Sequence, residues 1–358
     1  MAFEPKLVVS QAVVRELRQL IRANGFDLFG VLPIGPSQTM PQLTDWLARD
    51  QHGTMDWMAK PESLTKRANP AAILPSARSI ITLAFRYTPD PIPEELLQDP
   101  SRGIIARYAL YDDYHVIIKK KLINLGRALE QPFGVVDWKA YVDTGPFLER
   151  EWASRAGLGF IGRNSNLIHY TLGSYLFLAE LLVDVDLPTV QKNPVGSCGR
   201  CTNCKDDCPT GAILDDGTID SNRCISYLTI EHRGSISEPL RPLMKNRIYG
   251  CDICQEVCPW NKKSTALPPQ TKEDFMVRTD LVAPKLADLM FFDDESYRER
   301  FRRSPIRRAK REGFMRNISI ALGNWGSLEA VELLQQIQQQ DPSPLVQEHV
   351  TWALAQCR

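Results

Sequence analysis

The sequence lacks any long hydrophobic run. Its 358 residues contain no stretch of about 18 apolar residues, the length that a membrane-spanning helix needs. The longest apolar stretch, Tyr175 to Val185, is interrupted by Glu180 and predicts a buried strand. The opening residues, MAFEPKLVVS, lack the basic segment and apolar core of a secretory signal. We therefore expect a cytoplasmic protein with no membrane partner.

The chain also lacks an excess of charge and the common nucleotide-binding motifs. Its 43 Lys and Arg residues balance 43 Asp and Glu residues, so the overall charge predicts no polyanionic partner. No GxGxxG fingerprint follows an expected strand, and no GxxxxGK[ST] loop occurs. These absences disfavour both a dinucleotide-binding Rossmann site and an NTPase.

Cysteine, in contrast, is concentrated in one region. Eight of the nine cysteines lie between residues 198 and 258, in runs spaced as CxxCxxCxxxCP and CxxCxxxCP. The first run has the spacing of bacterial ferredoxins, in which the fourth cysteine ligates the other [4Fe–4S] cluster. The second run lacks its first cysteine, because Ile248 stands three residues before Cys251. Cys224 is the only cysteine between the runs, so we expect it to replace the missing ligand.

The spacing therefore predicts two [4Fe–4S] clusters and makes the chain an electron carrier. One cluster is expected on Cys198, Cys201, Cys204 and Cys258. The other is expected on Cys208, Cys224, Cys251 and Cys254. Two structural zinc sites are an alternative, because CxxC pairs also bind zinc. A disulfide framework is another alternative, but it belongs to an oxidising compartment.

The expected elements divide the chain into three parts. Residues 1–185 mix helical and strand patterns, which predicts an α+β catalytic domain. Residues 186–265 are rich in Gly, Pro, Asp and Cys, so clusters must organise this part. Residues 266–358 begin with a linker at Pro268-Pro269 and continue as helices. In the first part we expect a helix capped by Ser10 and ending near Gly25, strands at Phe29–Ile34, Ile80–Phe85 and Tyr175–Val185, and a helix at Tyr114–Leu129.

The last part shows a weak internal repeat. Ala321-Leu322 recurs as Ala353-Leu354, a pattern typical of HEAT-type helical repeats. The apolar stripe of the helix between them consists of Leu328, Val331, Leu334 and Ile337. An ordinary helical cap is the alternative to a repeat.

A basic run precedes the repeat. Eight basic residues and one acid, Glu299, lie between Arg298 and Arg311. A run of this kind is either a solvated face or a patch that binds phosphate groups.

Two neighbouring segments carry candidate catalytic and binding groups. The segment YVDTGPFLER contains a tight turn with Asp143. The segment GLGFIGRNSN follows, and its glycines allow the backbone to approach a ligand closely. It ends in Asn164, Ser165 and Asn166, which offer hydrogen bonds without charge. On these grounds alone Asp143 is either a turn residue or a catalytic one.

Together these segments resemble the epoxyqueuosine reductase family. The resemblance rests on VDTGPFLERxWAxRAGLGFIGRNSNLI, on the two cysteine runs, on CISYLTIE and RIYGCDICQEVCPWN, and on RGIIARYAL followed by DYH. It covers nearly the whole chain in the right order, which is far more specific than a ferredoxin motif. It implies a nitroreductase-like cobalamin-binding domain, a double-cluster ferredoxin-like domain and a C-terminal HEAT-like helical domain.

The resemblance implies an oxidoreductase of queuosine biosynthesis and tRNA processing. Such an enzyme reduces epoxyqueuosine at the wobble position of tRNA to queuosine, using cob(I)alamin fed by two [4Fe–4S] clusters. It implies Asp143 as the proton donor, a role suited to a carboxylic acid with a raised pKa. The expected cofactor contacts are Arg67, Tyr108, Asp143, Asn164, Ser165, Asn166, Ser226 and Tyr227. The corrinoid motif DxHxxG is missing, so cobalamin would bind without that histidine.

The implied substrate gives the basic run a function. A tRNA anticodon stem-loop is a dense polyanion, and its wobble base must leave the stack to reach a buried active site. The expected phosphate contacts are Arg298, Arg300, Arg302, Arg303, Arg307, Arg308 and Lys310. We also expect an electron donor such as a flavodoxin or ferredoxin, and a monomeric enzyme.

Two other functions compete with this interpretation. A reductive dehalogenase shares the corrinoid and double-cluster arrangement, but usually carries an export signal and lacks a helical tail. A ferredoxin-like electron-transfer subunit would need neither the 185-residue first part nor the basic tail.

Overall fold

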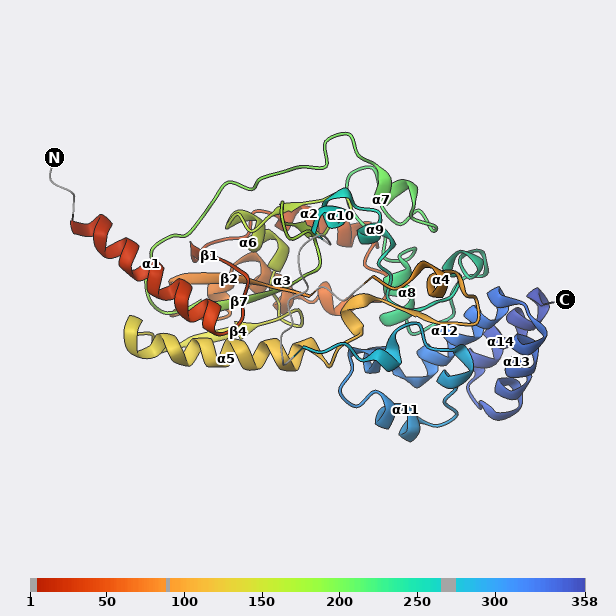
Figure 1. Ribbon diagram of the computed structural model, residues 1–358. Coiled ribbons are helices and arrows are strands. Elements are labelled where there is room, and N and C mark those ends of the chain that lie inside the picture. Colours follow the sequence, from red (N-terminus) through yellow and green to blue (C-terminus); the bar gives the residue numbers. More distant parts are fainter. Residues whose placement is uncertain (1–4, 88–90, 265–274, 358) are drawn as a thin grey trace.

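The protein has a mixed α and β architecture (Figure 1). The computed structural model describes residues 5–87, 91–264 and 275–357, so the linker expected at Pro268-Pro269 lies outside the described residues. The strands are β1 (Leu28–Pro33), β2 (Ser79–Arg86), β3 (Ile104–Ile105), β4 (Trp138–Tyr141), β5 (Phe160–Ile161), β6 (Leu167–Ile168), β7 (Leu176–Val183) and β8 (Arg247–Tyr249). The α-helices are α1 (Pro5–Ala23), α2 (Met40–Ala48), α3 (Pro61–Ala68), α4 (Glu94–Gln98), α5 (Tyr114–Phe133), α6 (Glu149–Arg155), α7 (Asn203–Asp206), α8 (Ile225–Ile230), α9 (Ile253–Glu256), α10 (Pro259–Ser264), α11 (Asp294–Arg300), α12 (Lys310–Trp325), α13 (Leu328–Gln340) and α14 (Pro344–Gln356).

A four-stranded antiparallel sheet forms the centre of the first part, with strand order β1-β2-β7-β4. Every residue of β2 is buried, because successive side chains point to opposite covered faces. Ile81 and Leu83 belong to the core that α1 and α5 share, whereas Ile80 and Ala84 pack with Trp152 of α6. No helix in the described part of the chain is long and apolar enough to cross a membrane.

The strands expected in the first part are confirmed within two residues, and the expected helix from Tyr114 ends at Phe133 instead of Leu129. The three strands correspond to β1, β2 and β7, and Glu180 of β7 is fully buried. Helix α5 begins at Tyr114, where the side chain of Asp113 accepts a hydrogen bond from the His115 amide. The cap predicted at Ser10 is wrong, because α1 already begins at Pro5. Proline fits the first turn of a helix, where its missing N–H has no partner.

The cluster-binding segment is packed into the rest of the molecule. Strand β3 pairs in parallel with β8, and Val31 of β1 forms a bridge with Val190. One continuous hydrophobic core extends from Leu17 to Ala353. The boundaries at 185/186 and 265/266 stay predictions.

The C-terminal part is helical, as expected. Helices α12 and α14 meet at Gly323, where an added Cβ would lie 2.7 Å from the Cβ of Ala353. This close approach requires a residue without a side chain. Leu334 and Ile337 of α13 are buried, but the place of Leu328 in the apolar stripe is wrong. Leu328 is 85% exposed, because it occupies the first turn of α13, beyond the neighbouring helices.

Candidate active site and cluster-binding cavity

Four of the predicted cluster ligands surround one cavity of about 230 Å³. The amide of Arg163 donates a hydrogen bond of 3.4 Å to the sulfur of Cys198. Among the residues the structure describes, no three Cys, His, Asp or Glu side chains converge as a single metal ion requires. The four cysteines are Cys198, Cys201, Cys204 and Cys258.

The other predicted ligands also lie within electrostatic reach of one another. Cys224, directly before α8, interacts with Cys208, and Cys254 interacts with Cys251 and Cys224. Burial raises the pKa of Cys251 to about 12, so a thiolate at this position needs a positively charged partner such as iron. Cys224 therefore stands beside the second run, where the spacing lacks a ligand.

Asp143 lies at the tip of the DTGP turn with a strained backbone. Its φ of 55° is in the left-handed region, which residues other than glycine, asparagine and aspartate rarely adopt. The hydroxyl of Tyr114 donates a hydrogen bond to Oδ2 of Asp143 at 2.8 Å. Nε2 of His115 lies 3.0 Å from the same oxygen. The side chain is still 58% exposed, so it remains open to a ligand.

His115 links two carboxylates. Its Nδ1 lies 2.7 Å from Oδ1 of Asp113, and its Nε2 faces Asp143. Burial alone would lower the pKa of His115, but the hydrogen bonds to Asp113 and Asp143 outweigh it and raise the pKa to about 9. The imidazole is therefore protonated at neutral pH, and the network consists of Asp113, a charged His115 and Asp143.

The same network corrects one expectation. Desolvation by the surrounding protein would raise the pKa of Asp143, but the hydrogen bonds from His115 and Tyr114 outweigh this effect, so the pKa is lowered. The prediction of a raised pKa for Asp143 is wrong for this structure. The proton that an acid catalyst would need is held on His115, next to Asp143.

The half-buried Glu149 supports the turn and interacts with the buried Glu180, and the sequence analysis missed both as site residues. Oε1 of Glu149 accepts a hydrogen bond of 2.6 Å from the amide of Asp143. Burial next to Asp143 raises the pKa of Glu149, and burial next to Glu149 raises that of Glu180. Glu180 is fully buried, and its strand partners are Thr82 and Tyr141. A lone acid in an otherwise apolar strand was the available sequence sign of this pair.

Several predicted cofactor contacts lie around Asp143 and the cysteines. The ring of Tyr108 lies 6.0 Å from that of Tyr114, which places it beside Asp143. Nδ2 of Asn164 donates to the carbonyl of Cys254 at 3.2 Å, next to the cluster ligands. The hydroxyl of Ser165 donates to the carbonyl of Gly217 at 2.8 Å.

Nearby, the guanidinium of Arg150 links the turn at residues 164–166 to the Asp143 turn. It donates to the carbonyl of Ser165 and interacts with Asp143 and Glu149. The amide of Asn166 donates to Oδ1 of Asn164 at 3.3 Å, so the three residues 164–166 form one turn.

The remaining predicted contacts have different surroundings. Arg67 is buried under Trp57, and its Nη1 has no hydrogen-bond partner within the described part of the chain. A buried, unpaired guanidinium nitrogen fits a polar ligand. The hydroxyl of Tyr227 already accepts a hydrogen bond of 2.6 Å from the amide of Thr54. Ser226 is half-buried, and its carbonyl accepts a hydrogen bond from the Thr229 hydroxyl.

A hollow of about 590 Å³ borders the Asp143 turn. Its wall includes His115, Tyr141, Thr144 and Gly145, and Lys119 lies on its α5 side. This volume is in the range of small-molecule sites in proteins.

The basic run lies beside the same turn. The carbonyl of Arg303 accepts a hydrogen bond of 2.8 Å from the amide of Asp113, and Arg308 interacts electrostatically with Asp143. Arg308 also forms a two-pronged ion pair with Glu231, at 2.8 and 2.7 Å. The predicted phosphate contacts that are exposed are Arg298, Arg302, Arg303, Arg307, Arg308 and Lys310, and Arg300 is half-buried.

The comparisons with known proteins agree with this arrangement. Residues 67–144 match the model of the epoxyqueuosine reductase QueG family (DUF1730), and residues 197–261 match that of the 4Fe-4S double cluster binding domain. The chain is 42% identical to the epoxyqueuosine reductase of Escherichia coli (strain K12) over 337 residues, which is 93% of this chain and 86% of that protein.

Solved structures give the same result. A crystal structure of epoxyqueuosine reductase with an epoxyqueuosine-modified tRNA-Tyr stem loop has a TM-score of 0.85 at 28% identity, over 97% of this chain and 91% of that one. The enzyme from Bacillus subtilis, with its aspartate-bearing catalytic loop swung out of the active site, has a TM-score of 0.83 at 27% identity, with the same coverage. From the sequence match over most of both chains, we conclude that this protein belongs to the epoxyqueuosine reductase family.

Proposed function

We propose that this enzyme reduces the epoxide of epoxyqueuosine at the wobble position of tRNA and releases queuosine. The observation that carries the proposal is the exposed carboxylate of Asp143, which is hydrogen-bonded to Tyr114 and to a protonated His115. Its turn borders a ligand-sized hollow, and the arginine-rich run lies beside the same turn.

The overall reaction defines what the residues must supply. Converting an epoxide to an alkene breaks both carbon–oxygen bonds, consumes two electrons and two protons, and releases the oxygen as water. Asp143 is the proposed proton donor, and His115 is the reservoir that recharges it. A ligand that covers Asp143 removes water from its carboxylate, which raises the pKa and favours transfer of the proton from His115.

Cobalamin is the proposed reductant at this site, and it would supply the electrons as cob(I)alamin when bound. Arg67, with its unpaired Nη1, and Tyr108, beside Tyr114, are the proposed contacts, together with the turn at residues 164–166. Ser226 and Tyr227 stay predicted contacts; the hydroxyl of Tyr227 is already engaged by Thr54. The eight cysteines would hold two [4Fe–4S] clusters that pass electrons to this site.

tRNA is the proposed macromolecular substrate. A related structure contains an epoxyqueuosine-modified tRNA stem loop, and the basic run of this chain borders the Asp143 turn. Arginines at this place would bind phosphates of the anticodon stem while the wobble base enters the hollow. The electron donor, a monomeric state and a cytoplasmic location stay predictions.

Anaerobic turnover tests the proposal. The purified protein, with both clusters verified, is incubated with cobalamin, a strong reductant and tRNA from cells blocked at the last step of queuosine formation. Nucleoside mass spectrometry should show conversion of epoxyqueuosine to queuosine that depends on cobalamin. Absence of conversion with clusters and cobalamin bound would favour another corrinoid reductase. Absence of bound cobalamin would favour an electron-carrier function.

A further inference from the structure

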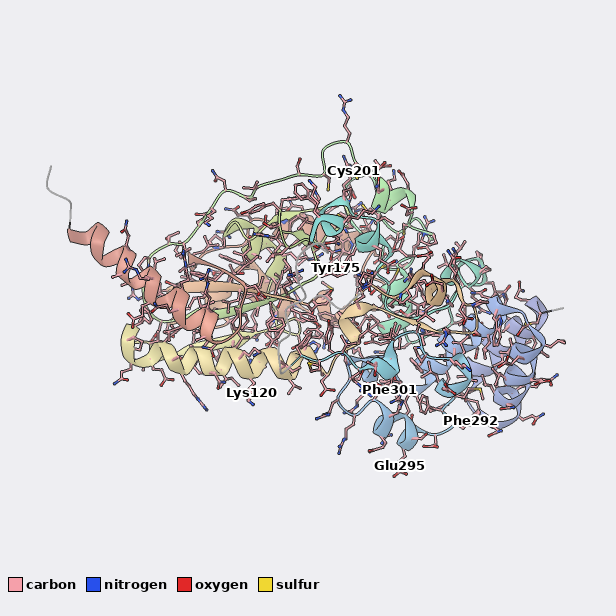
Figure 2. The ribbon with its side chains drawn as sticks, viewed as in Figure 1. Lys120, Tyr175, Cys201, Phe292, Glu295 and Phe301 are labelled. Carbon is pink, nitrogen blue, oxygen red and sulfur yellow. The ribbon has the colours of Figure 1, made fainter. Side chains whose placement is uncertain are left out.

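The cavity lined by Cys198, Cys201, Cys204 and Cys258 opens at the periphery of the molecule. Cys201 lies near the upper edge of the view in Figure 2, away from the centrally placed Tyr175. The cavity wall also includes Trp260 and Lys263 of α10 and the side chain of Arg163. An electron that enters from outside would therefore reach this cluster first.

Exposed apolar residues gather beside this cavity. Ile161 and Val195 are 45% and 58% exposed, which is unusual for large aliphatic side chains. The residues that flank them in the chain contact one another. Phe160 packs edge-on against Trp260 at 5.6 Å, and Gly196 approaches the rings of both aromatic residues.

Basic side chains lie on the same surface, next to α7, which carries the exposed Asp206 and Asp207. Lys263 lies 5.1 Å from the ring centre of Trp260, and Arg163 donates to the carbonyl of Gly199 at 3.1 Å, next to exposed Arg200. Within the ranges that the structure describes, Arg163, Arg200 and Lys263 form no ion pair. The whole chain has no net charge, so this positive surface is local.

We propose that this surface, made of Ile161, Arg163, Val195, Arg200, Trp260 and Lys263, is the docking site of an acidic, low-potential one-electron carrier protein. The small apolar centre and basic rim match a transient electron-transfer contact, because such complexes bury little area and depend on complementary charge for rapid association. At each encounter the carrier loses one electron and the adjacent cluster gains it, so two encounters supply one turnover. The inference rests on the proposed iron–sulfur function but not on the identity of the tRNA substrate.

The test uses the cluster-loaded enzyme without tRNA, so it does not depend on epoxyqueuosine reduction. Reduced flavodoxin is mixed with the oxidised enzyme under anaerobic conditions, and cluster reduction is followed by absorbance. We expect the second-order rate constant of the unmodified enzyme to fall steeply with rising salt. Arg200→Glu/Lys263→Glu should lower this rate constant about tenfold or more at low salt and flatten its salt dependence.

Two controls separate docking from damage to the cluster. Arg15→Glu/Arg127→Glu makes the same change in charge on α1 and α5, on the opposite side of the sheet domain from α7, and should leave the rate unchanged (Figure 1). Calorimetric titration with oxidised flavodoxin gives a readout without electron transfer, and the docking variant should bind more weakly. If the reversed charges impair cluster loading, the milder Arg200→Gln/Lys263→Gln replaces the docking variant. It should show a smaller loss of the same rate constant. A salt-independent rate for the unmodified enzyme, or equal losses in the two charge-reversed variants, would overturn the proposal.

Discussion

At the residue scale, the proposed proton path depends on a histidine held between two carboxylates. Burial lowers the pKa of the half-buried His115 imidazole, but Asp113 and Asp143 together raise it to about 9. A general acid works best when its pKa is near the operating pH and its proton is within hydrogen-bond reach. The strained backbone at Asp143 then fixes the carboxylate where this proton can reach it.

Turnover should therefore show an alkaline limb. The pKa of His115 is raised above its ordinary value of about 6.5 to about 9. The imidazole is therefore fully protonated below about pH 6.5 and loses its proton as the pH rises through about 9. We expect turnover with tRNA to fall in the same direction, by about tenfold per pH unit above pH 9. His115→Asn should be slower at neutral pH and should lose this limb. A pH profile identical to that of the unmodified enzyme would remove His115 from the proton path.

Glu149 should act as a positioning residue for Asp143. Its Oε1 accepts the Asp143 amide, which holds the turn in place. Glu149→Ala removes this acceptor and should lower kcat on the order of 100-fold, because small misplacements of a catalytic group are costly. Glu149→Gln keeps an acceptor oxygen and should recover most of the activity. Steady-state kinetics checks this, and equal losses in both variants would indicate that charge, not position, is what matters.

At the scale of single elements, the strands and cysteine runs were the predictable features. Burial on both faces gives β2 and β7 continuous apolar patterns that the sequence displays directly. The start of α1 was missed because Pro5 and Ser10 are both good residues for a helix start. The Glu149–Glu180 contact could not be predicted, because it depends on how α6 lies over the sheet.

The short helix α8 offers a test of the cluster assignment. Cys224 immediately precedes it and interacts with Cys208. Cys224→Ser should reduce the iron content by about half and leave the cluster at Cys198 intact, because only one ligand set is broken. Iron analysis with electron paramagnetic resonance of the reduced protein measures this. Cys357→Ser is the matched control, and two intact clusters in Cys224→Ser would disprove the assignment.

At the scale of the whole molecule, the predicted first and third parts meet beside Asp143. Their order could be predicted from motifs, whereas their contacts could not, since contacts such as the one between Asp113 and Arg303 join residues far apart in the chain. Of the predicted site residues, the cysteines and the basic run were recognisable from spacing and charge. The corrin contacts carry no comparable pattern, which is why Arg67 and Tyr227 have such different surroundings.

The basic run should dominate the salt dependence of tRNA binding. Arg302 and Arg307 are exposed, and neither forms an ion pair in the described ranges, so both are available to phosphates. Arg302→Glu/Arg307→Glu should weaken tRNA binding and reduce the slope of log K against log salt by about 1.5. Filter binding over a range of salt concentrations measures both effects. Arg15→Glu/Arg127→Glu is again the control, and the same slope in both variants would leave the run as a solvated face.

The parallel pairing of β3 with β8 has a consequence for how the protein is made. Ile104 and Ile105 leave the ribosome long before Arg247 and Tyr249, their strand partners. Until synthesis passes β8, the first part of the chain exposes an unpaired strand and an open side of its core, a state prone to aggregation. Folding of the first part of the chain around β3 is therefore completed only after the cluster-binding segment that contains β8 has folded.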